Sequence, residues 1–409
     1  MTHPNCYRLA AETLGKAEIN AAKAVLDSGM LTMGADVHDF EKAFARWVGV
    51  EHAVMVNSGS SANLIASDAL IRRTSSRPPL TAGDEVLVPG LAWPTTVWPL
   101  AQLGLVPVFV DIDLLTLGLD LSSAEAAIGP RTRAMVLIHP LGRALDVSAY
   151  KAFCDAHGLT LIEDCCESLG AFSEGFHVGT NSMAGTFSFY FSHHISTIEG
   201  GMVVTQDSNL ADDLRGLRAH GWIRDRADRQ SWVDANPELD PRFLFATVGY
   251  NVRPTNLQAA IGSVQLERLD QMLESREQLA RWVSELVRES VPWLELLGRD
   301  RISQDRPSVR QERTHSWMTL PFRVRAEAPV TAREVMTCLE ADGVETRAII
   351  AGNLARHPAI HQIAHRADVP LARCDELLET SFMIGCHPVL ADATKRTLEH
   401  AIRALSQLG

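Results

Sequence analysis

Short runs of apolar residues alternate with amphipathic stretches through roughly the first 270 residues of the chain. The runs predict seven strands, at residues 52–57, 85–88, 106–112, 134–139, 159–164, 186–191 and 202–205. Most of them are continuously apolar, which is typical of strands that helices cover on both faces. The stretches between them, such as residues 61–73 and 147–157, have the spacing of amphipathic helices. This alternation indicates an α/β fold with a mostly parallel, seven-stranded sheet.

The pattern changes near Gly249, where a long helical region begins and continues to about Glu289. We interpret it as the passage from a large domain, residues 1–265, to a smaller C-terminal α/β domain, residues 266–409. Apolar runs at 318–324 and 344–349 predict strands of the smaller domain. A chain of 409 residues is long enough for two domains of these sizes.

Composition narrows the classes of partner. The chain is 46% hydrophobic and 22% charged, as globular proteins are. The net charge is −12 and no block is rich in Lys or Arg, so no nucleic-acid partner is expected. No stretch reaches the roughly 18 apolar residues that span a bilayer, and the first residues lack a basic region followed by an apolar run. We therefore expect a cytoplasmic protein with no membrane partner.

The cysteines give no metal pattern. There are seven, and no pair has the spacing of a zinc ribbon, so no metal ion is expected. Cys165 and Cys166 are adjacent and follow an apolar run, which is typical of buried thiols.

Residues 56–63 form a candidate anion site. A predicted strand ends here, small residues including Gly59 and Ser60 follow, and an apolar helix begins. The free N–H groups and the dipole of a helix N-terminus suit a phosphate group. A Ser-Gly-Ser sequence before a helix is also an ordinary N-cap, so this segment alone leaves both interpretations open.

Two more segments place polar or flat side chains at strand ends. The strand at 159–164 ends in Asp164, at the edge where α/β sheets bind ligands. Trp93 lies in the loop after the strand at 85–88, where its indole can stack on a flat ring. A strand-end Asp can equally cap the next turn, and a Trp can equally belong to the core.

Residues 185–201 carry the most informative pattern. Ser188 lies on a strand, His193 follows five residues later, and Glu199-Gly200-Gly201 close the segment. The segment resembles the cofactor-anchoring strand of the DegT family, sugar aminotransferases that use pyridoxal phosphate (PLP). Counted back from Glu199, the lysine that binds PLP covalently in that family falls on His193. The resemblance covers nearly the whole chain.

The resemblance implies a fold of PLP-dependent type I, similar to aspartate aminotransferase. It implies cofactor contacts from Gly59, Ser60, Trp93, Asp164, Glu167, Ser188 and Asn251. Asp164 corresponds to the residue that keeps the ring nitrogen protonated, and Trp93 corresponds to the residue that lies over the ring. Glu167 corresponds to a residue that faces the cofactor, and Ser188 corresponds to a phosphate ligand. Asn251 corresponds to a residue that enters the neighbouring subunit's phosphate site, which implies a homodimer.

The histidine changes the expected reaction. An imidazole transfers protons, but it cannot form the covalent bond that lysine forms with PLP. One branch of the family carries His at this position: the 3-dehydratases of nucleotide-linked 4-keto-6-deoxyhexoses. The chain is most similar to the branch acting on GDP-4-keto-6-deoxy-D-mannose. This implies PLP or pyridoxamine phosphate (PMP) bound non-covalently, His193 as general acid and base, and L-glutamate as the amino donor that regenerates PMP.

Two further residues, Arg347 and His220, are candidates for binding the nucleotide-sugar substrate. Arg347 is a plausible fork for a carboxylate or phosphate, or simply a surface arginine. A related dehydratase subtype uses an iron–sulfur cluster, which needs about four cysteine ligands. No cysteine lies between Cys166 and Cys338, so no cluster is expected here.

Two alternatives remain open. The chain could be an aminotransferase-like enzyme of the DegT family acting on another keto substrate, or a non-catalytic PLP-binding regulator. Retention of Trp93, Asp164 and Ser188 with a titratable base at His193 favours an enzyme. The sequence does not reveal the sugar or the nucleotide.

Overall fold

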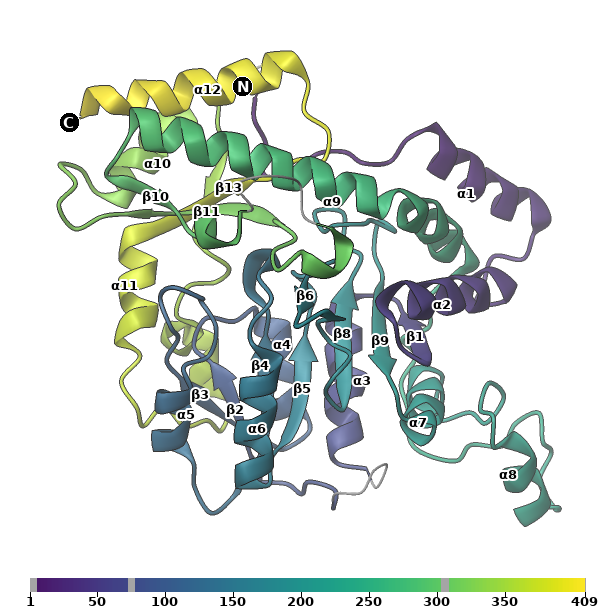
Figure 1. The fold of residues 1–409 in the computed structure, drawn as a ribbon. Helices are drawn as coiled ribbons and strands as arrows, with labels where there is room; N and C mark the ends of the chain where they lie inside the picture. Colours follow the sequence, from purple (N-terminus) through teal and green to yellow (C-terminus); the bar gives the residue numbers. More distant parts are fainter. Residues whose placement is uncertain (1–5, 73–77, 303–308, 409) are drawn as a thin grey trace.

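A computed structural model describes residues 6–72, 78–302 and 309–408. A seven-stranded sheet forms the centre of the larger part, and a four-stranded sheet forms the centre of the smaller part (Figure 1). The strands of the larger sheet are β1 (His52–Val56), β2 (Glu85–Pro89), β3 (Val106–Val110), β4 (Thr132–Ile138), β5 (Thr160–Asp164), β8 (Ala184–Ser188) and β9 (Gly201–Thr205). All seven predicted strands are present, with ends that differ by a few residues.

The order of the strands is β1-β9-β8-β5-β4-β2-β3. Neighbours from β8 to β3 pair in parallel, and only β9 runs antiparallel to both of its neighbours. The prediction of a mostly parallel sheet is therefore confirmed. The parallel strands end at one edge, so the loops that follow β2, β4, β5 and β8 meet there.

Helices cover both faces of this sheet. One face packs against α3 (Gly59–Leu70), α4 (Pro94–Gln102) and α7 (Ser208–Arg218). The other packs against α2 (Ala35–Val48), α5 (Leu121–Ala127), α6 (Val147–His157) and α9 (Asn256–Ser290). Alternate residues of one strand enter opposite cores: Val86 and Val88 face α4, whereas Leu87 faces α5 and α6. Burial on both faces explains why the strands read as continuous apolar runs.

Helix α9 joins the two parts. A capping box of Thr255 and Gln258 starts it, and it then runs for 35 residues without interruption. Its first half packs with α2 and with α1 (Lys16–Ser28), and its second half enters the core of the smaller part. The predicted long helix is present, but it begins at Asn256, not near Gly249. The domain boundary at residue 265 stays a prediction, and it lies inside this helix.

The smaller sheet has the order β10-β11-β13-β12, with every pair antiparallel. Its strands are β10 (Leu294–Leu296), β11 (Thr319–Val324), β12 (Thr346–Arg347) and β13 (Ser381–Gly385). Helices α10 (Ala332–Ala341) and α12 (Asp392–Ala404) share its core with α9. Tyr7 is fully buried in the same core and donates its hydroxyl to the Gly385 carbonyl at 2.8 Å. The N-terminal strand-like segment thus packs with the C-terminal part.

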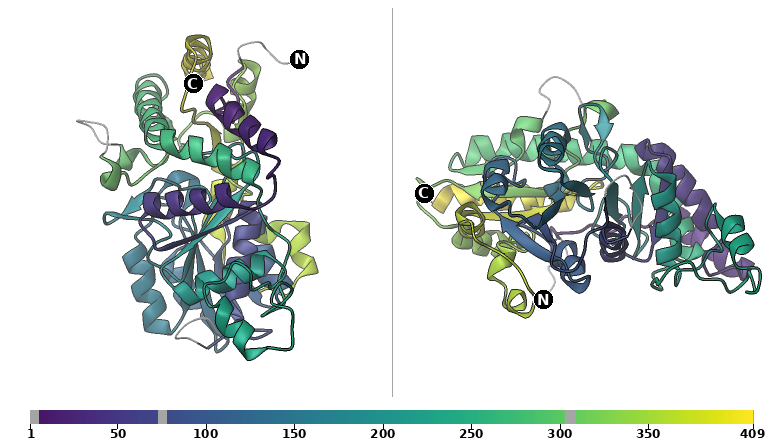
Figure 2. Two further views of the ribbon diagram at one scale, coloured as in Figure 1. Left: turned by 90° about the vertical axis from the view of Figure 1, so that its right-hand side faces the viewer. Right: turned by 90° about the horizontal axis from the view of Figure 1, so that it is seen from below.

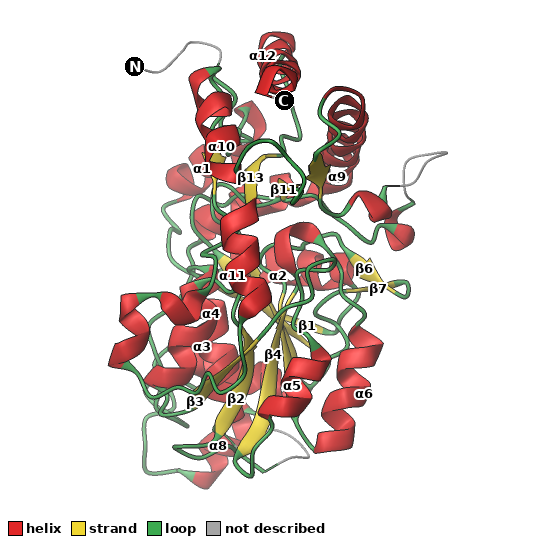
Figure 3. Ribbon diagram, turned by 90° about the vertical axis from the view of Figure 1, so that its left-hand side faces the viewer, coloured by secondary structure: helices red, strands yellow, loops and turns green. Residues whose placement is uncertain are grey.

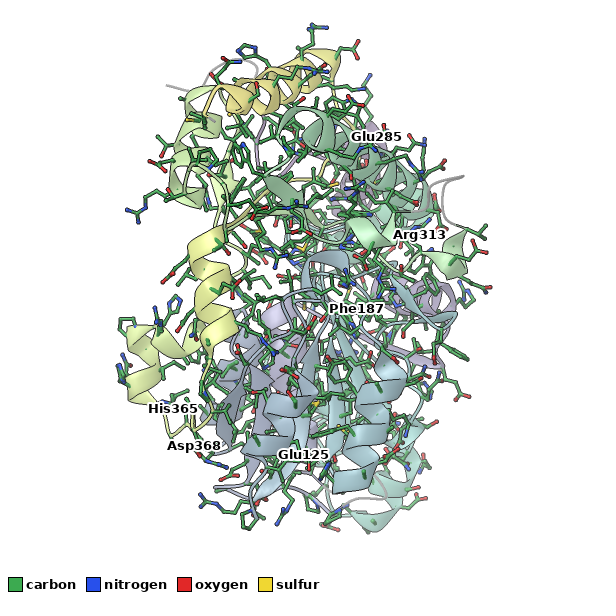
Figure 4. All side chains as sticks on the ribbon, turned by 60° about the vertical axis from the view of Figure 1, so that its left-hand side comes forward. Glu125, Phe187, Glu285, Arg313, His365 and Asp368 are labelled. Carbon is green, nitrogen blue, oxygen red and sulfur yellow. The ribbon has the colours of Figure 1, made fainter. Side chains whose placement is uncertain are left out.

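Residues 348–380 return to the larger part. Leu354 and Ile360 enter the core beside β2 and β4, and Arg366 forms a bridge to Val108 on β3. Figure 4 shows His365 and Asp368 of this segment alongside the larger part, whose interior holds Phe187. Helix α11 (Ala372–Thr380) then leads back to β13, and Figure 3 shows it lying beside both sheets.

A long excursion follows α7. Residues 219–255 include α8 (Arg229–Ala235) and project from the sheet edge on the same side as α1 (Figure 2). Several large apolar side chains on it are exposed, among them Phe243, Phe245 and Val248, the last of these 84% exposed. The remaining short elements are β6 (Phe172–Ser173), β7 (Phe176–His177), and single 3-10 turns at Pro140–Gly142, Arg299–Arg301, Arg310–Glu312, Leu354–Arg356, Pro358–Gln362 and Leu405–Leu408. In the described part of the chain, no helix combines the length and apolarity needed to cross a membrane.

Candidate active site

A cavity of about 420 Å³ opens between the ends of the parallel strands and the smaller sheet. This volume is within the range of small-molecule sites, which is about 300–1,000 Å³. Seven of the ten residues predicted from the sequence line it: Gly59, Ser60, Trp93, Asp164, Glu167, Ser188 and His193. They come from the segments that follow β1, β2, β5 and β8, which are far apart in sequence.

Asp164 is the most strongly fixed of these side chains. It ends β5 and is only 4% exposed. Its Oδ2 atom accepts hydrogen bonds from Asn63 Nδ2 at 2.8 Å and Thr96 Oγ1 at 2.7 Å. Its Oδ1 atom accepts from the Cys166 N–H at 3.0 Å. Thr186 Oγ1 donates to Asn63 Oδ1 at 2.6 Å, which fixes the orientation of the Asn63 amide.

A buried pair supports the end of β5 from behind. His139 Nδ1 accepts the Leu145 N–H at 3.1 Å, so its Nε2 atom carries the proton and donates to Glu163 Oε2 at 2.9 Å. Burial alone raises the pKa of Glu163, but the hydrogen bonds from His139 and the Gly179 N–H lower it below its ordinary value. His139, Glu163 and Cys165 also form a cluster of possible metal ligands, and all three are buried in the interior.

The N-terminus of α3 lies at the cavity and offers groups that suit an anion. Ser58 caps the helix by accepting the Ser61 N–H at 3.1 Å. The N–H groups of Gly59 and Ser60 make no hydrogen bond to another described residue. A Cβ atom on Gly59 would lie 2.5 Å from Ser188 Cβ, so only glycine lets the helix approach the β8 serine this closely. Two free N–H groups, a helix dipole and a hydroxyl at one point suit a phosphate.

His193 and its neighbour face different surroundings. His194 is buried and its Nε2 atom lies 3.1 Å from the Ser316 carbonyl, as a structural histidine does. His193 lines the cavity, and its buried Nδ1 atom has no hydrogen-bond partner among the described residues. Burial lowers the pKa of His193 to about 4. Its imidazole is therefore neutral near pH 7 and free to accept a proton.

Glu167 responds to burial in the opposite direction. Burial, with a smaller effect of the Asp164 charge, raises the pKa of Glu167 to about 7, although the Leu141 N–H donates to its Oε2 atom at 2.7 Å. Near neutral pH this carboxyl group exchanges protons readily. On another side of the cavity Trp93 is 57% exposed, so its indole is available to a ligand.

Three predicted residues lie outside the cavity in the single chain. Arg347 is exposed and forms an ion pair with Glu345 at 2.7 Å. Asn251 is exposed, accepts from Arg253 Nε at 3.0 Å, and forms a bridge with Ala219 next to His220. Asn251 and His220 therefore lie together on the excursion after α7, and neither lines the cavity.

Sequence reasoning missed other residues that line the cavity. Asn63 and Thr96 belong to the segments that drew attention, but their bonds to Asp164 depend on the packing of α3 and α4. Met318 and Met383 come from the smaller part and Ile350 from the segment that returns from it, and no motif marked these three residues. Short antiparallel strands give no local signal of which side chain faces a ligand.

Comparison with known proteins agrees with this geometry. The model of the DegT/DnrJ/EryC1/StrS aminotransferase family matches residues 12–403. The GDP-4-keto-6-deoxy-D-mannose 3-dehydratase of Yersinia pseudotuberculosis is 37% identical over 358 residues, 87% of each chain. The dTDP-4-dehydro-2,6-dideoxy-D-glucose 3-dehydratase of Saccharopolyspora spinosa is 32% identical over 92% of this chain and 81% of that protein. A solved structure of GDP-4-keto-6-deoxymannose-3-dehydratase with a trapped PLP-glutamate geminal diamine has a TM-score of 0.85 and 32% identity, and the match covers 98% of this chain and 99% of that one.

The raised pKa of Glu167 predicts a pH-dependent cost to stability. The folded-state pKa, about 7, lies above the ordinary 4.5, so the folded protein holds this proton more tightly than the unfolded chain does. The carboxyl group therefore destabilises the fold as the pH rises from 4.5 to 7. We expect the difference in unfolding free energy between Glu167→Gln and the parent to shift by about 3 kcal/mol in favour of the variant when the pH rises from 4.5 to 7.5.

The measurement is urea unfolding of the cofactor-free protein at both pH values. Glu267→Gln, on the exposed side of α9, is the control and should show no such gain. An equal difference between Glu167→Gln and the parent at both pH values would contradict the prediction.

Proposed function

Because this chain belongs to the DegT/DnrJ/EryC1/StrS aminotransferase family, we propose that it is a PLP-dependent 3-dehydratase. It removes the C3 hydroxyl of a nucleotide-linked 4-keto-6-deoxyhexose, in deoxysugar biosynthesis. The observation that carries the proposal is His193, a neutral imidazole in the cavity at the position of the family's lysine. The relatives named as 3-dehydratases support it.

The cavity fits PLP without a covalent bond. Asp164, held by three donors, would face the ring nitrogen, and Trp93 would cover the ring. Ser188 and the free N–H groups of Gly59 and Ser60 would hold the phosphate. The bound cofactor supplies an electron sink for the charge that develops when a proton is removed next to it.

His193 provides the proton transfers. Its imidazole lines the cavity and can accept a proton, because the lowered pKa keeps it neutral near pH 7. The imidazolium so formed lies in a desolvated site and gives its proton up readily. Its best acceptor is the departing C3 hydroxyl, which leaves as water. A lysine at this position would instead hold the cofactor covalently and favour amino transfer.

The proposed reaction balances with L-glutamate as the second substrate. At C3 of the sugar a CHOH group becomes CH₂, which is a two-electron reduction. L-Glutamate is oxidised to 2-oxoglutarate and its nitrogen is released as ammonia. The oxygen lost from the sugar balances the oxygen gained by the keto acid. An aminotransferase would release no ammonia and would leave the nitrogen on the sugar.

We propose a homodimer that shares its active sites through Asn251. The exposed apolar side chains Phe243, Phe245 and Val248 lie on the same excursion as Asn251, and patches of this kind commonly mark interfaces. His220 lies beside Asn251 and would reach the partner's substrate from the same segment. Arg347 would contact the substrate only after leaving Glu345. Nucleotide sugars and L-glutamate are charged and do not cross a bilayer unaided, so we propose that the enzyme works in the cytoplasm.

The alternative functions are an aminotransferase-like enzyme on another keto substrate and a PLP-binding regulator. Incubation with PLP, L-glutamate and GDP- or dTDP-linked 4-keto-6-deoxyhexoses separates them. We expect a product lighter than the substrate by one oxygen atom, with ammonia and 2-oxoglutarate in equal amounts. Mass spectrometry and an ammonia assay measure this. An aminated sugar, or formation of 2-oxoglutarate without conversion of any sugar, identifies the first alternative. No conversion of any sugar and no 2-oxoglutarate from L-glutamate identifies the second.

Two substitutions of His193 test its assignment. His193→Asn should leave folding and PLP binding intact and slow dehydration by roughly 10²–10⁴-fold, the usual contribution of a general acid and base. His193→Lys should give a yellow protein in which borohydride fixes PLP to residue 193, and C3 deoxygenation should be suppressed. Absorbance and peptide mass spectrometry measure the covalent bond. Full dehydratase activity of the lysine variant would show that His193 does not select elimination.

The shared site predicts complementation between two inactive chains. In a heterodimer of Asn251→Ala and His193→Asn chains, one site holds an intact His193 from one chain and an intact Asn251 from the other. The two chains are coexpressed with different affinity tags. The unseparated mixture should have about one quarter of the activity of the unmodified enzyme, because half of the dimers are mixed and each mixed dimer has one intact site of two. If Asn251 serves its own chain, the purified heterodimer will be as inactive as either parent variant.

A further inference from the structure

The two sides of the cavity differ in chemistry. The larger domain contributes mostly polar groups, including Asp164, Glu167, Ser188 and His193. Among the described residues that line the cavity, those beyond residue 199 are Met318, Ile350 and Met383. None of these three side chains offers a strong hydrogen-bond donor or acceptor. We call this set the apolar wall. The part of a ligand that contacts the apolar wall cannot form hydrogen bonds with these three side chains.

The fold holds the apolar wall firmly in place. Met383 lies on β13 between Phe382 and Ile384, which enter the core of the smaller part, so Met383 points to the opposite face, toward the larger domain. Met318 precedes β11, and its backbone is bound on two sides. Its N–H donates to the Leu141 carbonyl at 3.0 Å, and its carbonyl accepts from Arg276 Nη1 at 3.1 Å.

Ile350 has a backbone conformation that its side chain disfavours. Its φ angle is +52°, in the left-handed region, where a β-branched residue is a rare outlier. The turn is closed by the Gly352 N–H, which donates to the Ile349 carbonyl at 2.9 Å. Glycine adopts this conformation without strain, yet the position holds a large apolar side chain that lines the cavity. Strain of this kind is characteristic of ligand-binding sites.

We propose that Met318, Ile350 and Met383 form the subsite for the C6 methyl group of the sugar. In a nucleotide-linked 4-keto-6-deoxyhexose C1 carries the diphosphate, C2 and C3 carry hydroxyl groups and C4 is a carbonyl carbon. The methyl group on C5 is therefore its one fully apolar substituent. A 6-hydroxy sugar would lose the hydration of its hydroxyl against this wall and gain no partner. The apolar wall therefore selects 6-deoxy over 6-hydroxy substrates. The assignment of a sugar to this subsite rests on the proposed function.

Binding of unreactive ligand pairs tests the selection. GDP-6-deoxy-D-mannose and GDP-D-mannose differ by one oxygen atom at C6, as do dTDP-6-deoxy-D-glucose and dTDP-D-glucose. Calorimetry with the PLP-loaded protein should show a preference for the 6-deoxy member of at least one pair by about 10–100-fold, the usual range for one small group in an apolar pocket. GDP and dTDP alone should bind all variants equally.

Two variants locate the preference on the apolar wall. Met383→Gln keeps the length of the side chain but adds polar atoms, and should reduce the preference by about 10-fold. Ile350→Gly removes the side chain and relieves the positive φ, so it should reduce the preference without lowering the unfolding temperature. The controls are Met336→Gln on α10, and Glu174→Gly, which relieves a φ of +51° in the turn between β6 and β7. Both should retain the parent preference.

The outcomes separate this inference from the proposed function. Equal affinity for the members of both pairs, failure of all four sugars to bind, or an unchanged preference in both wall variants would overturn the methyl subsite. A preference that depends on the wall, in a protein that does not deoxygenate any 4-keto sugar, would keep the subsite and overturn the 3-dehydratase assignment. Deoxygenation without the preference would do the reverse.

Discussion

The hydrogen bonds to the Asp164 carboxylate impose the main constraint on this structure. A buried carboxylate is costly unless donors surround it, and here the donors come from three separate elements. Asn63 belongs to α3, Thr96 to α4, and the Cys166 N–H to the turn after β5. These contacts form only when α3 and α4 pack against one face of the sheet in one register. The same packing brings the N-terminus of α3 against Ser188, so the candidate phosphate cradle and the candidate ring-nitrogen contact are fixed together.

Helix α9 connects this site to the smaller part of the structure. The guanidinium group of Arg276 on α9 is buried and donates to the carbonyls of Trp317, Met318 and Cys386. These three residues belong to the segments next to β11 and β13. A buried guanidinium with several carbonyl partners tolerates little displacement, because each lost bond leaves a buried polar group unpaired. The apolar wall is thereby held at a set position relative to the polar side of the cavity. One continuous helix thus connects the two parts that line the cavity, whereas a loose linker would leave their relative position variable.

The parts of this structure that are encoded locally could be predicted from the sequence. The seven apolar runs predicted the large sheet, and residues 147–157 predicted α6 with its observed ends, because burial on both faces of a parallel sheet leaves a clear pattern. Seven candidate residues meet in the cavity because strand ends of a parallel sheet converge by topology. Contacts set by tertiary packing could not be predicted. Nothing near Met383 indicates its orientation, Arg347 is engaged by Glu345 two residues away, and the role proposed for Asn251 depends on a second chain.

Burial shifts the pKa values of two groups that line the cavity, His193 and Glu167, in opposite directions, and this gives the site its chemical character. Desolvation disfavours the charged form of either group, so it lowers the pKa of His193 to about 4 and raises the pKa of Glu167 to about 7. Between these pKa values both groups are mainly neutral, so the imidazole can accept a proton and the carboxyl group can donate one. In water the imidazole has the higher pKa, and the two roles are reversed. The potential at the phosphate end then comes from fixed sources, the dipole of α3 and its free N–H groups, which do not titrate. An anionic ligand can therefore be held by the N-terminus of α3 while protons move at His193 and Glu167, because binding and proton transfer use different groups.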